Sequence, residues 1–174
     1  MRLVNHHHMK LDQTIDSLIL DIFPVMPSSG SWPFTMTSIE RNELIGLKME
    51  KTVFASSQLL VLKRTDFNGG DLIDYAMKSK EYQTIPAQLR LEFLDKYNNL
   101  AESEQTLQDW TDRITSMAIG LVIKTALNKG LQLVPIDTDH SILDKHMGFE
   151  NKELATFQLF DIYNLDPSFL AADY

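Results

Sequence analysis

The segment Ser103–Ile136 reads SEQTLQDWTDRITSMAIGLVIKTALNKGLQLVPI and contains the strongest helical pattern of the chain, followed by a strand pattern. Apolar residues recur at helical spacing from Leu107 to Leu121, and the first serine of the segment can cap the helix. Gly130 supplies a C-terminal stop. Because the second half of this helix is apolar over much of its circumference, we expect a central helix that is buried on more than one side.

Shorter patterns surround this segment. We expect further helices over residues 15–23, 40–51, 71–77, 86–100 and 141–146, and strands over residues 34–37, 58–62, 131–136 and 154–162. Leu44, Ile45 and Leu47 are expected to point inward, and Asp71 to cap its helix. This order of elements predicts an α+β class, and the lack of an obvious linker or repeat predicts a single domain over residues 1–174.

Composition excludes several classes of function. The chain has 174 residues, with 24 acidic and 16 basic residues and a formal net charge of -8. An acidic balance argues against partners such as nucleic acid or an anionic membrane, which need a cationic surface. The absence of cysteine excludes thiol catalysis, disulfides and iron–sulfur clusters. Since no apolar stretch is long enough to span a membrane and the N-terminus lacks a signal-peptide pattern, we expect a cytoplasmic protein.

Common catalytic and metal-binding motifs are missing from the chain. There is no phosphate-binding loop, dinucleotide fingerprint, zinc-protease motif or nucleophile elbow. Two groups could suggest a metal, namely His6–His8 and the set Asp137, Asp139 and His140. Adjacent histidines near a terminus are poor ligands for one preformed site, and the second set is typical of a polar loop that caps the next helix. We therefore predict no metal site.

The segment 27–36, PSSGSWPFTM, carries a resemblance to a known family. It resembles the Pro-Ser-Ser-x-Asn-x-Gln-Pro-Trp-x-Phe segment of the nitroreductase-like flavoproteins. Its Pro-Ser-Ser matches directly, and Pro33, Phe34 and Met36 match the later positions if one residue is deleted. Ser31 stands where the family has asparagine, and the glutamine has no counterpart. The order of the later elements is also similar to that of the family, from the long helix through the strand, the short helix and the late strand.

The resemblance implies a nitroreductase-like α+β fold with a mixed sheet flanked by helices and a long central core helix. It also implies a homodimer that binds FMN at the interface. The partners would be NAD(P)H and a small aromatic acceptor, and the reaction would reduce nitroaromatic, quinone or similar acceptors. No catalytic side chain is expected because the flavin carries the chemistry.

The resemblance also implies which residues bind the cofactor. Hydroxyl groups of Ser28 and Ser29, with Ser31 in place of the asparagine, would bond the flavin or its ribityl-phosphate chain. Backbone groups after the core helix would approach the flavin ring, which points to Pro135 and Ile136. For the serines the alternative is an ordinary Pro-Ser-Ser-Gly turn.

The chain departs from the family in its phosphate-binding residues. Family members begin with Arg-Arg-Ser-x-Arg, whereas this chain has Arg2 alone, with His6 near the second basic position. Members also place a Lys or Arg near the C-terminus, and here no basic residue follows Lys152. Lys48 or Lys51 could compensate, although a plain surface lysine is the favoured interpretation of both.

Three functions remain open at this level. The leading hypothesis is an FMN-dependent NAD(P)H oxidoreductase whose acceptor is selected by the helices within residues 71–100. Tyr75, Tyr82 or Tyr97 could stack on an aromatic acceptor there, or could simply pack the helices. The alternative is a non-catalytic dimer of the same fold that binds flavin weakly or another small ligand. The third is an unrelated α+β interaction domain.

Overall fold

The computed structural model describes residues 32–45, 47 and 57–165. Its strands are β1 (Phe34–Glu40), β2 (Ser57–Arg64), β3 (Leu131–Ile136) and β4 (Leu154–Asn164). Its α-helices are α2 (Gly69–Lys78), α3 (Lys80–Thr84), α4 (Arg90–Ala101), α5 (Glu104–Asn128) and α6 (His140–Met147). Short 3-10 helices lie at Arg41–Leu44, Ala87–Leu89 and Glu150–Lys152. The α+β class is confirmed.

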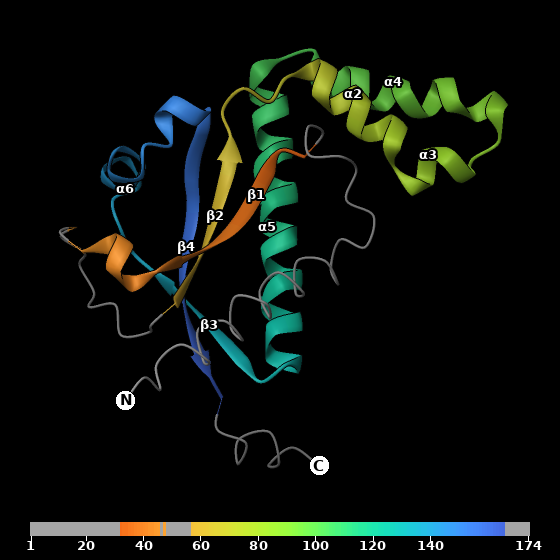
Figure 1. Ribbon diagram of the computed structural model, residues 1–174. Coiled ribbons are helices and arrows are strands. Elements are labelled where there is room, and N and C mark those ends of the chain that lie inside the picture. Colours follow the sequence, from red (N-terminus) through yellow and green to blue (C-terminus); the bar gives the residue numbers. More distant parts are fainter. Residues whose placement is uncertain (1–31, 46, 48–56, 166–174) are drawn as a thin grey trace.

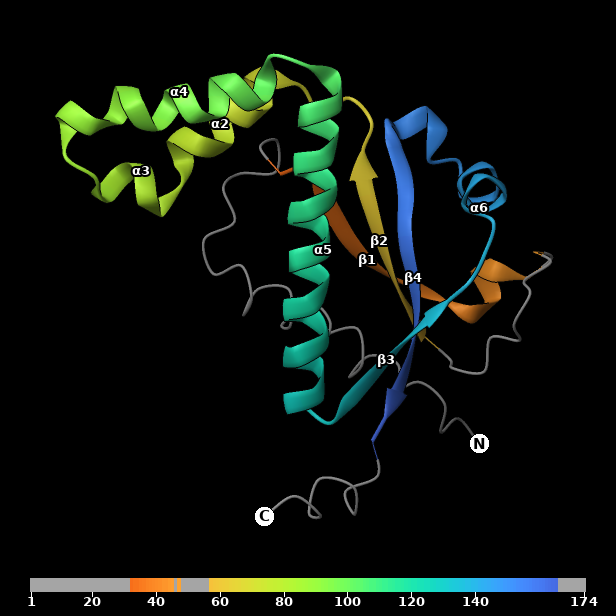
Figure 2. The same cartoon turned by 180° about the vertical axis from the view of Figure 1, so that it is seen from behind.

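The four strands form one sheet in the order β1-β2-β4-β3. All three pairings are antiparallel, with one register irregularity in β2 between Val61 and Leu62. Because β1 and β3 are the outer strands, each pairs on one side only with the strands that the structure describes. The sheet is covered on both faces by helices, with α5 along one face and α6 on the other (Figures 1 and 2).

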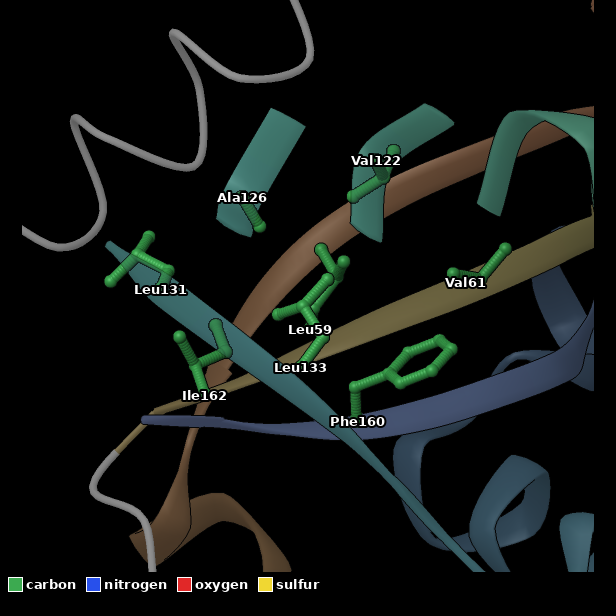
Figure 3. Close-up of a cluster of buried hydrophobic side chains, with 8 residues drawn as sticks. All are labelled: Leu59, Val61, Val122, Ala126, Leu131, Leu133, Phe160 and Ile162. Atoms are coloured by element: carbon green, nitrogen blue, oxygen red, sulfur yellow. The ribbon is translucent and has the colours of Figure 1, made fainter. Parts of the chain in front are cut away.

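Side chains that alternate along the strands divide the core between the two faces. The α5 face contains Leu59, Val61, Val122, Ala126, Leu131, Leu133, Phe160 and Ile162 (Figure 3). The α6 face contains Ile39, Leu44, Leu60, Leu62, Ile136, Leu143, Phe149 and Leu159. The central strand β2 is buried over its first six residues, which explains its continuous run of apolar residues.

Helix α5 is buried along one side only among the described residues. Small side chains such as Thr115, Ala118 and Ala126 face the sheet, while Met117 and Leu121 on the outer side are 62% and 49% exposed. The expectation of burial on more than one side is therefore wrong for the part of the chain that the structure describes. No helix in the described ranges is long and apolar enough to cross a membrane.

Helices α2, α3 and α4 project from the N-terminal end of α5 and are called the excursion below (Figure 1). Aromatic side chains join the excursion to the rest of the fold. The Tyr75 ring lies between Trp32 and Trp110, with ring centroids 5.2 and 5.3 Å away, and Trp110 stacks on Phe67. Phe34 contacts the Trp32 ring edge to face at 5.5 Å. We call these five residues the aromatic junction.

Local predictions succeed where the sequence signals are strong. Ser103 caps α5 by accepting a hydrogen bond from the Thr106 amide, and the chain takes a positive φ of 76° at Gly130. The strands extend beyond the predicted ranges by one to three residues at several ends. Asn68, rather than Asp71, is the N-cap of α2, and Asp71 closes a capping box from the third helical position.

The helix expected over residues 40–51 is wrong in its described part. Glu40 ends β1, and Arg41–Leu44 forms a single 3-10 turn. Leu44 is buried and Leu47 packs on the core, but Ile45 is 74% exposed because the tighter turn rotates it away from the sheet. Residues 46 and 48–56, like the helix expected at 15–23, lie outside the described residues.

Helix α6 is fixed to the sheet by a buried carboxylate. Asp144 accepts a hydrogen bond from the Thr156 backbone amide at 2.8 Å and another from the Thr156 hydroxyl. We expect Asp144→Ala to lower the free energy of unfolding by about 1–3 kcal/mol or more, because the buried amide and hydroxyl of Thr156 both lose their acceptor. Urea unfolding measures this, with Asp95→Ala on the exposed side of α4 as the matched control. Equal stability of the two variants would contradict the prediction.

Candidate functional site

The outer edge of β3 is the candidate site. Pro135 lies exposed on this strand, and Val134 is 37% exposed. A proline is tolerated there because an edge strand does not need every amide for pairing. The edge therefore combines an apolar surface with backbone groups that no described strand pairs, which suits a flat ligand that is polar only along its rim.

The position of β3 is fixed from both faces. Leu131 and Leu133 are buried against α5, whereas Ile136 is buried in the cluster under α6. The Gln158 side-chain amide donates hydrogen bonds to the carbonyls of Ile136 and Leu159, at 3.3 and 3.0 Å. This strand is thus held rigidly by packing and by a side chain of the neighbouring strand, which is what a binding edge requires.

The loop after β3 serves to start α6. Asp139 caps the helix by accepting hydrogen bonds from the amides of Ser141 and Ile142. The hydrogen bond from the Ser141 hydroxyl, followed by these amides, lowers the pKa of Asp139 below its usual value. No group of potential metal ligands occurs within the described ranges. The capping role explains Asp139 in the set Asp137, Asp139 and His140, while His6–His8 lie outside the described residues.

A buried polar row next to β3 was not predicted. Asp161 on β4 and Gln58 on β2 are 4% and 0% exposed, and their side chains form a hydrogen bond of 3.1 Å. Tyr163 donates a second hydrogen bond to Asp161 at 3.1 Å. The available signal was a carboxylate within the apolar strand pattern of β4, although the sequence could not show that Gln58 is its partner.

Only two predicted binding residues can be located. Pro135 and Ile136 lie at the end of β3, where Pro135 is exposed and the Ile136 side chain is 4% exposed. A ligand at this edge could therefore reach only the backbone of Ile136. The other predicted binding residues lie outside the described residues, namely Arg2, His6, Ser28, Ser29, Ser31 and Lys48.

The three tyrosines of the excursion pack against other side chains. Tyr75 belongs to the aromatic junction, and Tyr97 lies against the buried ring of Phe93 at 5.1 Å. Burial raises the pKa of both tyrosines, with a smaller contribution from nearby acidic groups. The guanidinium of Arg90 covers the Tyr82 ring at 5.2 Å. These contacts favour the packing interpretation over stacking on an acceptor.

Comparison with known proteins gives matches to solved structures. No protein-family model and no curated protein sequence matches the chain. A nitroreductase family protein from Streptococcus pneumoniae is 14% identical, with a TM-score of 0.61 over 88% of this chain and 80% of its own. A protein from Exiguobacterium sibiricum, described as a nitroreductase in complex with FMN, is 14% identical, with a TM-score of 0.63 over 93% of this chain and 86% of its own.

A third structure is described as an NAD(P)H:FMN oxidoreductase from Staphylococcus epidermidis. It is 17% identical, with a TM-score of 0.58 over 88% of this chain and 76% of its own. At these low identities the structural match establishes a common fold, and activity has to be argued from the site. This chain is therefore a divergent protein of the nitroreductase fold.

Proposed function

We propose that the protein is an FMN-dependent NAD(P)H oxidoreductase that reduces nitroaromatic, quinone or similar acceptors. The observation that carries this proposal is the exposed, rigidly held outer edge of β3 directly after the long helix. The fold supports it, since one protein of this fold is described in complex with FMN and another as an NAD(P)H:FMN oxidoreductase. A shared fold does not establish function, so the proposed activity rests on the candidate site and on the experiments that test it.

The described residues fit the ring part of FMN. Val134 and Pro135 offer exposed apolar surface, and the outer backbone edge of β3, which no described strand pairs, offers hydrogen-bonding groups for the polar rim of the ring. The phosphate is assigned in this proposal to residues outside the described ranges, with Arg2, His6 and Lys48 as its cationic contacts. FMN bound there would supply hydride transfer, and the protein would supply orientation and electrostatics.

We also infer a homodimer with the cofactor at its interface. The outer side of α5 exposes Met117 and Leu121, and a side chain added at Gly120 between them would meet no atom within 4 Å. Such a surface is apolar and able to accept a closely approaching helix. In addition, the excursion and β3 meet α5 at opposite ends of a helix that is roughly 37 Å long. A second subunit would let the excursion cover a β3 edge that its own subunit places far away.

The proposed dimer can be tested by a substitution that introduces a charge on the outer side of α5. We expect Leu121→Glu to shift the protein from dimer to monomer, because a buried, unpaired carboxylate opposes association. Sedimentation velocity measures the shift. Ile142→Glu on α6 is the matched control, since Leu121 and Ile142 are 49% and 50% exposed and lie on opposite sides of the sheet. A monomeric wild type, or equal dissociation of both variants, would contradict this interface.

A non-catalytic dimer that binds flavin weakly is the second candidate. The sequence feature that favours it is the small number of basic residues available for the phosphate, because residues 153–174 contain none and Arg2 is the only arginine before Arg41. Hydrogen bonds to charged groups contribute about 1.5–3 kcal/mol each, so loss of two would weaken FMN binding by several powers of ten.

Flavin retention separates the two candidates. We expect the protein, loaded with FMN and freed of excess, to keep a visible flavin band at about one flavin per subunit and to oxidise NAD(P)H with nitroaromatic or quinone acceptors. Val134→Asp should weaken FMN binding at least tenfold, because it places a carboxylate against the apolar edge of β3. Gln132→Asp on the same strand is the control. A colourless dimer would overturn the enzymatic proposal and leave the second candidate.

A further inference from the structure

Asp161 is a buried carboxylate that forms no ion pair with any residue that the structure describes. It is 4% exposed, and none of the ion pairs in the described part of the chain includes it. A buried charge without an opposite charge is costly to keep, so its presence calls for an explanation. The proposed function gives no role to Asp161.

The neighbours of Asp161 are neutral hydrogen-bond donors. The Gln58 amide donates to Oδ1 and the Tyr163 hydroxyl donates to Oδ2, each at 3.1 Å. Both carboxyl oxygens thus accept hydrogen bonds. Partial burial and the bond to Asp161 raise the pKa of Tyr163 above its usual value, so the phenol keeps its proton and acts as the donor. Neither donor places a positive charge beside Asp161.

The register places this charge beside the candidate site. Asp161 pairs with Gln58 across β2 and β4 and with Val134 across β4 and β3. Directly opposed residues of antiparallel strands have Cα atoms about 4.5–5.5 Å apart. The carboxylate is therefore one strand away from the exposed edge that is proposed to contact the flavin ring. Because it is buried, salt screens its field much less than that of a surface charge.

We propose that Asp161 supplies a fixed negative charge beneath β3 and lowers the reduction potential of FMN bound at this edge. This inference rests on the proposed function. Transfer of a hydride from NAD(P)H moves two electrons and one proton to the ring, so the reduced ring carries one more negative charge than the oxidised ring, while the nicotinamide is oxidised. A nearby carboxylate opposes that gain of charge, and the reduced form is bound less tightly relative to the oxidised form.

The functional consequence concerns the acceptor. A flavin of lower potential is a stronger reductant, which suits acceptors that are difficult to reduce. Asp161 would then determine which of the proposed acceptor classes the protein can reduce, although it touches neither substrate nor cofactor. Its role would be electrostatic, and removing its charge should change the potential without removing the binding edge.

The test is the midpoint potential of FMN bound to the full chain, measured by equilibration with a reference dye, together with the dissociation constant of oxidised FMN. We expect Asp161→Asn to tighten reduced FMN relative to oxidised FMN by about tenfold, which for a two-electron couple is a rise of about 30 mV. Tyr163→Phe keeps the charge and should give no rise. Glu150→Gln removes one exposed carboxylate in the 3-10 turn after α6 and should leave the potential unchanged.

Each outcome decides between the proposals. A flavin that binds to Asp161→Asn with an unchanged potential overturns the role of Asp161 and leaves the proposed function intact. A wild type that retains no FMN overturns the proposed function and this inference with it. If Asp161→Asn does not fold by circular dichroism, Asp161→Thr removes the same charge with a residue suited to strands. Failure of both variants to fold would make Asp161 purely structural and overturn the inference.

Discussion

The packing of α5 against one face of the sheet is the constraint on which the rest of the structure depends. Its sheet-facing residues are short, which lets the helix approach β2, β3 and β4 closely, and the larger residues of the strands fill the space between them. Since α5 leads directly into β3, the packing of α5 also fixes the direction of β3 and its position relative to the helix. The candidate binding edge is therefore a consequence of how the helix packs.

The two sides of α5 have different roles in this fold. The inner side packs against the sheet, while the outer side exposes apolar residues such as Met117 and Leu121 that no described element covers. An apolar surface of this kind is costly to leave in water. Helix α5 also separates the excursion from β3 by its own length, so one subunit alone does not bring the excursion and β3 together. Dimerisation would resolve both difficulties at once.

One row of residues across the sheet is polar, whereas most of its neighbours are apolar. Most of its rows are apolar, and the row that contains Gln58 and Asp161 interrupts them with a buried hydrogen bond and a charge. Burying polar groups costs free energy that apolar side chains in the same row would not cost. Asp161 is paired with Val134 in the sheet, so a charge on Asp161 would act on a cofactor bound at the β3 edge.

The sequence by itself determined the elements whose signals are local. Helix periodicity, the cap at Ser103, the stop at Gly130 and the apolar run of β2 fixed α5, β2 and the order of elements, because these depend on neighbours within a few residues. The tertiary structure decided the rest. It made Ile45 exposed, left one side of α5 uncovered by the described elements and joined Asp161 to Gln58, a residue 103 positions earlier in the chain. Such contacts arise only when the sheet brings distant strands together, and no local pattern encodes which strand will be the neighbour.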